Sequence, residues 1–447
     1  MPPRPLRPAD PLRANRHATR MRGLEFPGAR TGVDRILTAR GGAVARGNRT
    51  GERRMLLRVT ERGVYCEAGG FYVDPWMPVD RAVITHAHGD HARWGSRRYL
   101  CSREGERVLR TRMGPEANIR GVPYGEPVTV NGVRISLHPA GHILGSAQAR
   151  IEHRGEVWVV SGDYKTEPDP TCTPFEPVRC HTFVTESTFG LPIYRWAPQA
   201  ETWAEIRAWW RANREAGRVS ILFGYSLGKA QRLLAGVMDG LEGPIYTHGA
   251  VETLNREYRE SGIALPPTTH VGAAPRGTDW AGALVVAPPS AAGSPWLRRF
   301  GPASTAFASG WMRIRGARRR RSLDRGFVVS DHVDWPSLLA AVDATGASRV
   351  WVTHGYREPV VRWLREHGLE AHAIASRWEG EAEAEEAPPP DVVDGSANGS
   401  ADEAASAESV DDALDGGTVA DSAPVEGSFS ADDGAALDFG APGEGEP

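Results

Sequence analysis

The side chains best suited to catalysis are concentrated in one short stretch, Thr85-His-Ala-His-Gly-Asp-His91. It places three imidazoles and a carboxylate within six residues, directly after an apolar run. A structural histidine usually stands alone, whereas a glycine-containing loop at a strand end can turn three ring nitrogens toward one point. Histidine and carboxylate ligands without thiolates are typical of catalytic rather than structural zinc sites. The stretch therefore predicts a catalytic metal site and disfavours a chance surface cluster.

Three further segments offer the same kinds of ligand, each just past a predicted strand. They are Pro139-Ala-Gly-His142, Ser161-Gly-Asp163 and Val352-Thr-His354-Gly355. A glycine beside each candidate ligand lets the backbone approach a metal closely. Since strands with polar ends alternate through this region, we expect these loops to gather along one edge of a sheet.

Short β-rich runs alternate with helical runs from Met55 onward, which indicates a layered α/β protein. Strands are predicted at residues 81–85, 133–138, 157–161, 182–185, 219–223, 283–287, 327–330 and 348–353. Helices are predicted at about 200–217 and 228–238. No repeat period is present, which disfavours a repeat architecture.

The two ends of the chain differ from this central part. Residues 1–54 carry 13 arginines and four acidic residues without periodicity, and are interpreted as a basic flexible extension. A translation start at Met55 stays open as an alternative. Residues 380–447 carry 19 acidic residues and no lysine or arginine, so a disordered acidic tail is predicted. The central part is mildly basic, which suits a polyanionic substrate but also fits an ordinary surface.

The overall composition bounds the class of protein. Of 447 residues, 40% are hydrophobic and 24% charged, which excludes a wholly disordered chain. No apolar stretch is long enough for a membrane helix or a signal peptide, so a cytoplasmic protein without membrane contact is expected. The four cysteines, Cys66, Cys101, Cys172 and Cys180, lack CxxC spacing and are expected to be reduced and mostly buried.

Taken together, the motifs resemble the metallo-β-lactamase superfamily, whose HxHxDH signature matches His86, His88, Asp90 and His91. The resemblance implies an αββα sandwich that holds two zinc ions, with Mn²⁺ as a substitute. One zinc would take His86, His88 and His142, the other would take Asp90, His91 and His354, and Asp163 would bridge them. Such a pair activates water for hydrolysis. Asp74, in Phe71-Tyr-Val-Asp-Pro75, would support the site without binding metal.

Two later segments are similar to motifs A and B of the β-CASP nucleases, a branch of that superfamily. They are Thr185-Glu-Ser-Thr-Phe-Gly190 and Ser330-Asp-His-Val-Asp-Trp335, and His354 would be motif C. A phosphodiester hydrolase needs a proton donor for the leaving oxygen. His332 is the candidate, and Glu186 would orient it. The resemblance implies a metallo-β-lactamase domain at 55–200 and 317–379, with an inserted α/β cap domain at 201–316.

Several stretches look most like the prokaryotic ligase-associated DNA exonucleases, a group also described as mRNA 3′-end processing factors. The resemblance covers about residues 55–378, and is carried by Gly70–Trp76, Ala82–Ser96, Ala140–Gln148 and Ser161–Lys165. It implies a DNA or RNA substrate and association with a DNA ligase or helicase. The N-terminal extension and the acidic tail fall outside it.

Candidate contacts to nucleic acid are less distinct. The segment Trp311–Arg321 contains six arginines, among them Arg313, Arg315, Arg318 and Arg319, that could line a phosphate track. Taken alone, such a run is usually a solvated loop. Lys165, two residues after Asp163, is a further candidate. Trp94 and its neighbouring arginines are interpreted as a packed ring among solvated charges, with base stacking as the alternative.

The leading hypothesis is a two-zinc phosphodiesterase that acts as a DNA exonuclease in repair. An RNA 3′-end-processing endo- or exonuclease with the same site is the nearest alternative. A nucleic-acid-binding subunit with an inactive site is the alternative from another class, and the intact ligand set argues against it. A small-molecule esterase is disfavoured by the long cap segment and the motif at Ser330–Trp335.

Overall fold

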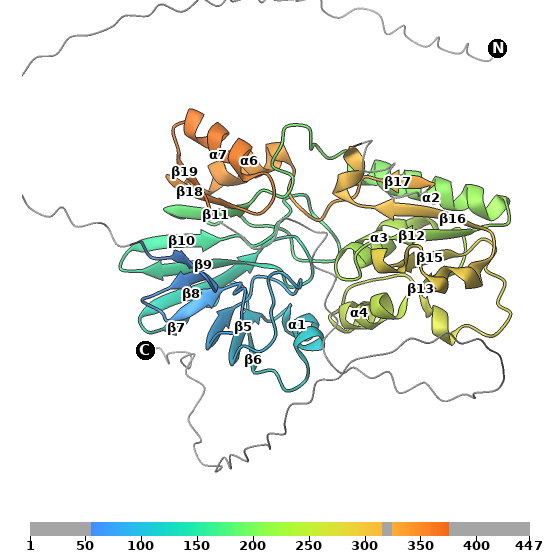
Figure 1. Ribbon diagram of the computed structural model, residues 1–447, viewed down its shortest axis with the longest axis horizontal. Helices are drawn as coiled ribbons and strands as arrows, with labels where there is room; N and C mark the ends of the chain where they lie inside the picture. The colour runs from blue at the N-terminus through green and yellow to red at the C-terminus, as the bar shows by residue number, and fades with distance from the viewer. Residues whose placement is uncertain (1–54, 315–323, 375–447) are drawn as a thin grey trace, which may run out of the picture. The chain divides into compact units, whose positions relative to one another are not determined.

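The computed structural model describes residues 55–314 and 324–374 (Figure 1). The extension expected at 1–54 and the tail expected at 380–447 lie outside the described residues, as do Arg315, Arg318 and Arg319. Within the described part, the strands form three sheets of six, seven and six strands. The mixed α/β class predicted from the alternating pattern is confirmed.

The first sheet follows chain order from β1 to β6, antiparallel over β1–β3 and parallel from β3 to β6. Its strands are β1 (Arg58–Thr60), β2 (Gly63–Cys66), β3 (Phe71–Val73), β4 (Arg81–Val83), β5 (Arg98–Ser102) and β6 (Ile119–Val122). Helix α1 (Glu106–Met113) packs against one face of this sheet, where Val108 and Leu109 join a cluster with Ile84 and Tyr99.

The second sheet has the order β19-β18-β11-β10-β9-β8-β7, parallel from β19 to β10 and antiparallel from β10 to β7. Its strands are β7 (Val128–Val130), β8 (Val133–Pro139), β9 (Ala147–His153), β10 (Glu156–Val160), β11 (Thr182–Glu186), β18 (Arg349–Thr353) and β19 (Glu370–Ala373). Helices α6 (Trp335–Thr345) and α7 (Arg357–Glu366) pack on one face, in a cluster that includes Phe183 and Val350.

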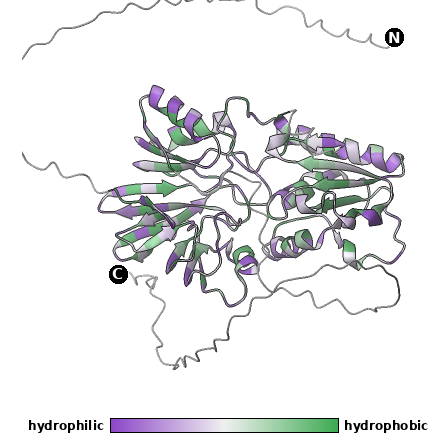
Figure 2. Ribbon diagram, in the orientation of Figure 1, coloured by the Kyte–Doolittle hydropathy of each residue, from purple (hydrophilic) through white to green (hydrophobic). Residues whose placement is uncertain are grey.

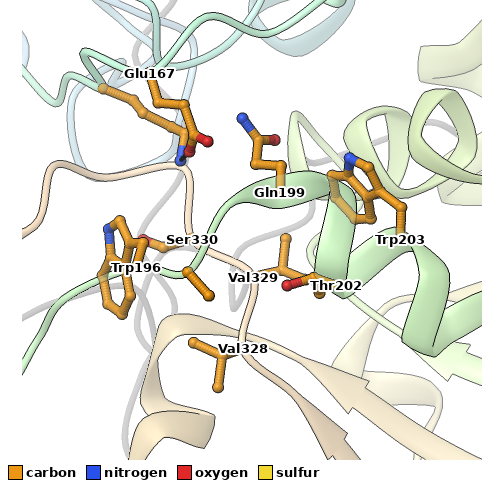
Figure 3. Close-up of a pocket in the computed structure, with 10 residues that line it drawn as sticks. Glu167, Trp196, Gln199, Thr202, Trp203, Val328, Val329 and Ser330 are labelled. Atoms are coloured by element: carbon orange, nitrogen blue, oxygen red, sulfur yellow. Dashed lines mark hydrogen bonds and ion pairs between the residues drawn. The ribbon is translucent and has the colours of Figure 1, made fainter. Parts of the chain in front are cut away.

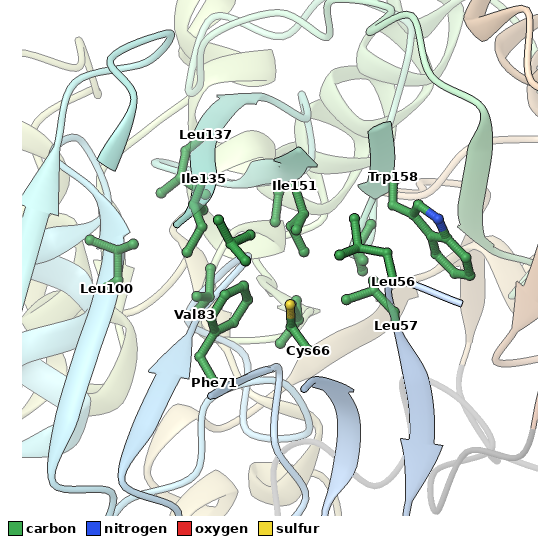
Figure 4. Close-up of a cluster of buried hydrophobic side chains, with 14 of the residues drawn as sticks. Leu56, Leu57, Cys66, Phe71, Val83, Leu100, Ile135, Leu137, Ile151 and Trp158 are labelled. Atoms are coloured by element: carbon green, nitrogen blue, oxygen red, sulfur yellow. The ribbon is translucent and has the colours of Figure 1, made fainter. Parts of the chain in front are cut away.

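These two sheets share one hydrophobic core, part of which is drawn in Figure 4. Val83 and Leu100 come from the first sheet, and Ile135, Ile151 and Trp158 come from the second. Alternate residues of each strand face the core, because side chains along a strand point to opposite faces. Helices cover the outer faces, so the layers run helix, sheet, sheet, helix.

The third sheet is parallel throughout, with the order β14-β13-β15-β12-β16-β17. Its strands are β12 (Val219–Phe223), β13 (Ile245–Thr247), β14 (Thr269–His270), β15 (Leu284–Ala287), β16 (Ala303–Ala308) and β17 (Arg325–Phe327). Buried clusters lie on both faces, as expected for a parallel sheet, and its strands are largely hydrophobic along their length (Figure 2). The helices are α2 (Gln199–Glu215), α3 (Lys229–Val237) and α4 (Gly249–Glu260), with 3₁₀ turns η1 (Met238–Gly240), η2 (Val271–Ala273), η3 (Pro289–Ala291), η4 (Pro295–Phe300) and η5 (Gly310–Arg313).

Most predicted elements match observed ones to within a few residues, but the strand predicted at 327–330 has the wrong bounds, since β17 spans Arg325–Phe327. β17 ends at Phe327, and Val328 and Val329 belong to the loop that follows it. Their apolar character reflects packing against the third sheet's hydrophobic clusters and not strand pairing. β17 pairs with β16, so the third sheet extends past residue 316. That residue is the predicted end of the cap domain.

The cysteines are free thiols, three of them buried and Cys180 partly buried, as predicted. Burial raises the pKa of the Cys172 thiol to about 12, so it is protonated near neutral pH. Among the described residues, no helix combines the length and the apolar character needed to cross a membrane.

The core predicts one stability measurement. Trp158 is fully buried, packs edge-to-face on Trp351 with 4.7 Å between ring centroids, and donates a hydrogen bond from Nε1 to Glu156. We expect Trp158→Ala to lower the free energy of unfolding by about 3–5 kcal/mol, measured by urea denaturation followed by circular dichroism. Trp94→Ala, which removes the ring of a residue that is 59% exposed, is the control and should change stability by less than about 0.5 kcal/mol. Equal effects of the two substitutions would contradict this account of the core.

Candidate metal centre

Four predicted ligands converge from three loops. His86 and His88 follow β4, His142 lies between β8 and β9, and Asp163 follows β10. One side-chain ligand atom from each lies within 4.8 Å of the others. Nδ1 of His88 is 3.1 Å from Nε2 of His86 and 3.0 Å from Nε2 of His142. We call these four residues the first cluster.

A second cluster consists of Asp90, His91 and His354, whose ligand atoms also lie within 4.8 Å of one another. His354 directly follows β18, the strand that pairs with β11. Asp163 lies between the two clusters, since its Oδ2 is 3.3 Å from Nε2 of His91 and 3.5 Å from Nε2 of His86. The loops that carry the predicted ligands therefore lie close to one another, as expected from the sequence.

The charges at these clusters suit bound cations. Burial lowers the pKa values of His86 and His142 well below the usual value, so both rings are neutral and have a lone pair to donate. Burial acts in the same direction on His91, but the carboxylates of Asp163, Asp90 and Asp74 outweigh it and raise the pKa of His91. Three carboxylates thus surround one imidazole, an excess of negative charge that divalent cations would neutralise.

Of the buried side-chain atoms that lack hydrogen-bond partners among the described residues, two belong to the second cluster. They are Oδ1 of Asp90 and Nε2 of His91. A buried polar atom without a partner costs free energy, of the order of 1–3 kcal/mol, and such atoms in a ligand set are typical of a metal site. Neutral imidazoles, carboxylates and these two atoms together fit divalent metal ions of the zinc or manganese type.

Asp74 holds the second cluster from outside. Its Oδ1 accepts a hydrogen bond from the backbone N–H of Thr85 at 2.8 Å, and its Oδ2 accepts one from the Thr85 hydroxyl at 2.6 Å. The same Oδ2 lies 2.8 Å from Nδ1 of His91. This contact fixes the ring so that Nε2 faces Asp163 and Asp90.

Glu186 and His332 form a buried pair beside the first cluster. Both carboxylate oxygens of Glu186 lie near Nδ1 of His332, at 3.0 and 2.9 Å. Glu186 ends β11 and also accepts a hydrogen bond from the backbone N–H of Tyr164. One ligand atom each of Asp163, Glu186 and His332 lies within 4.8 Å of the others, so the pair adjoins the carboxylate between the clusters.

Only some of the residues proposed to contact nucleic acid lie in the described part of the chain. Lys165 is buried, forms an ion pair with Glu167 at 2.8 Å, and lines a pocket that also includes Trp196 and Ser330 (Figure 3). Burial lowers the pKa of Lys165 to about 8. Arg313 is exposed, whereas Arg315, Arg318 and Arg319 lie outside the described residues. The expectation that Trp94 is packed is wrong, since the residue is 59% exposed.

An aromatic cluster next to His332 was not predicted from the sequence. It consists of Phe189, Tyr194, Trp196, Trp311 and Tyr356, linked by ring centroid distances of 4.8 to 6.3 Å. The ring of Phe189 lies 5.9 Å from that of His332, and Nε1 of Trp196 donates to the His332 carbonyl. Three members, Trp196, Trp311 and Tyr356, are partly exposed. The one sequence signal was that Phe189 and Tyr356 lie close to motif residues.

Comparison with known proteins gives relatives but no matching family model. A protein of Opitutus terrae named Probable DNA ligase is 33% identical over 315 residues, which are 70% of this chain and 30% of that protein. Endoribonuclease ysh-1 of Neurospora crassa is 32% identical over 119 residues, 26% of this chain and 14% of its own. Endoribonuclease YSH1 of Saccharomyces cerevisiae is 30% identical over 118 residues, 26% of this chain and 15% of its own. The matched region thus spans less than a third of each relative.

A crystal structure of a protein of unknown function from Enterococcus faecalis is similar over 67% of this chain and 80% of that one, with a TM-score of 0.46 and 10% identity. The class defined by the sheets and the clustered ligands is an α/β protein with a candidate metal centre. The sequence relatives define this class further. They show that the chain is a relative of the β-CASP nucleases of the metallo-β-lactamase superfamily.

The two clusters predict metal binding that can be measured without activity. We expect added Zn²⁺ to stabilise the protein by about 2.7 kcal/mol at a concentration of 100 times Kd, which raises the melting temperature. His86→Ala and His91→Ala should each reduce the bound zinc, measured by elemental analysis after dialysis. His372→Ala, which removes an exposed histidine on β19, is the control. Wild-type zinc content in both cluster variants would refute the ligand assignment.

Proposed function

We propose that this protein is a two-zinc phosphodiesterase acting on nucleic acid, with a DNA exonuclease activity in repair as the leading form. The observation that carries the proposal is the position of Asp163, which is shared between the candidate metal clusters and the Glu186–His332 pair. A hydrolase needs water activation and leaving-group protonation side by side, and this arrangement would support both once cations are bound.

In this proposal, His86, His88 and His142 would hold one divalent cation, Asp90, His91 and His354 would hold another, and Asp163 would be shared between them. Such cations, when bound, lower the pKa of water and neutralise phosphate charge. Asp74 keeps Nε2 of His91 directed at the centre. The fold proposed with this site is the αββα sandwich with an inserted β-CASP cap domain, which the layered sheets and the third sheet support.

His332 supplies the proton for the leaving oxygen. Glu186 occupies its Nδ1, which orients the ring and leaves delivery of the proton to Nε2. Because the His332 ring lies 4.8 Å from that of His142, a proton on it is close to the candidate metal centre. A phosphodiester held at the clusters would therefore have the proton donor on one side.

The aromatic cluster supports a nucleic-acid substrate. Partly exposed Trp311 and Tyr356 offer ring faces on which unpaired bases can stack, at about 1–3 kcal/mol per base. Arg313, exposed at the end of η5 and two residues after Trp311, would contact phosphate on the same strand. These features favour a single strand at the site over a small ester.

The identity of the nucleic acid separates the two leading forms. The name of the Opitutus protein favours DNA and a ligase as a functional associate, whereas the names of the fungal proteins favour RNA cleavage. RNA 3′-end processing is therefore the second candidate. Matched single-stranded DNA, duplex DNA and RNA, labelled at either end, would distinguish them.

For the nuclease assay, we expect His332→Ala to lower kcat by about 10²- to 10⁴-fold on the preferred substrate, because general acid catalysis contributes about that much. Glu186→Gln should also lower kcat, since it weakens the orientation of His332. The zinc content of both variants should match the wild type, and His372→Ala should keep full activity. Full activity in His332→Ala would disprove its role as the proton donor.

The assay also tests the binding-subunit alternative. A wild-type chain that binds labelled DNA or RNA tightly, and cleaves neither in the presence of Zn²⁺ or Mn²⁺, would favour a non-catalytic subunit. Cleavage that His86→Ala abolishes would exclude it.

A further inference from the structure

The turn between β12 and α3 contacts the first cluster directly. Nε2 of His88 lies 3.2 Å from the carbonyl oxygen of Leu227, which belongs to this turn. Gly228 follows with φ at 81°, and a Cβ there would come within 2.2 Å of the side chain of Ile143, the neighbour of His142. The turn therefore approaches the metal-ligand loop more closely than any residue with a side chain would allow.

Helix α3, which follows this turn, holds the loop that carries His332. Nζ of Lys229 lies 3.0 Å from the carboxylate of Asp331, and both side chains are buried. Arg232, one helical turn later, donates to the carbonyl of Ser330 at 2.6 Å and lies 3.7 Å from the Asp331 carboxylate. Because desolvation offsets the attraction within a buried ion pair, its main effect here is to position the loop of Asp331 and not to add stability.

The backbone of Asp331 in turn contacts a ligand of the first cluster. Its backbone carbonyl lies 3.0 Å from Nδ1 of His142. A carbonyl can only accept, so Nδ1 carries the proton and the lone pair of His142 is on Nε2, which faces His88. In the same way, the Leu227 carbonyl places the proton of His88 on Nε2 and the lone pair on Nδ1, which faces His86.

The second cluster has a different support. The carboxylate of Asp74, next to β3 in the first sheet, orients His91. Two of the three imidazoles in the first cluster instead contact carbonyls of Leu227, in the β12–α3 turn, and of Asp331, which pairs with Lys229 of α3. The two clusters therefore differ in which part of the chain fixes their ligands.

We propose that Lys229, Arg232 and Asp331 are positioning residues that set the metal affinity of the first cluster and not that of the second. This inference rests on the proposed function, because it needs the two clusters to bind metal. Groups that orient metal ligands typically change affinity by about 10- to 100-fold when they are removed. Helix α3 would thus control the occupancy of one of the two metal positions.

The test is zinc binding by the full chain, measured in competition with a chromophoric chelator. The variant is Asp331→Asn, which removes the charge that Lys229 and Arg232 hold but keeps the side-chain size and the backbone carbonyl. We expect one of the two zinc sites to weaken by about 10- to 100-fold, while the other keeps the wild-type affinity. Glu242→Gln is the matched control, since Glu242 also pairs with two cations, Arg211 and Arg214, but does so away from the clusters.

The outcomes separate this inference from the function that it rests on. Two sites of wild-type affinity in Asp331→Asn, or equal weakening of both, would overturn the inference alone. A wild-type chain that binds no zinc would overturn the proposed function and the inference together. If Asp331→Asn fails to fold, Lys229→Met/Asp331→Leu replaces the buried ion pair with apolar groups, a change that is often neutral for stability. The same loss at one site is expected there, and two intact sites would overturn the inference.

Discussion

A single buried carboxylate, that of Asp163, holds together the residues on which any chemistry of this protein depends. Its Oδ2 lies 3.3, 3.5 and 3.9 Å from the facing ring nitrogens of His91, His86 and His142, which come from two separate loops. A carboxylate in a buried position is costly unless other charges compensate it. Desolvation by burial would raise the pKa of Asp163, but the charge of the nearby His91 imidazole lowers it, so the loops that carry Asp163 and His91 stabilise each other.

Two residues in or next to the candidate metal clusters have an unusual backbone conformation. Asp74 and His354 are two of the four non-glycine residues with positive φ in the described part of the chain, at 44° and 52°. Such conformations cost about 1–3 kcal/mol each and persist only when the surroundings hold them. Asp74 is held by its hydrogen bonds to Thr85 and by its contact with His91. Local strain therefore coincides with the residues that would bind or support metal.

The grouping of the candidate ligands was predictable because their types and local spacing are unusual, and because strand ends bring their loops together. Glu186 and His332, separated by 146 positions, could be linked only through family motifs. The aromatic cluster gave almost no signal, since rings such as Phe189 and Trp311 fill ordinary cores just as well. Strands of three residues, such as β1 and β3, are too short to show alternation, and the apolar Val328 and Val329 imitated a strand.

The position of Gly355, directly after His354, has a consequence for how this protein can vary. A Cβ at Gly355 would come within 2.3 Å of the Ser187 carbonyl oxygen, which also accepts a hydrogen bond from the backbone of Tyr356. The loops that carry Glu186 and His354 therefore touch through main-chain atoms, with no space for even one methyl group. They form a single rigid block, so insertions, deletions or larger residues introduced by engineering would be tolerated only outside it.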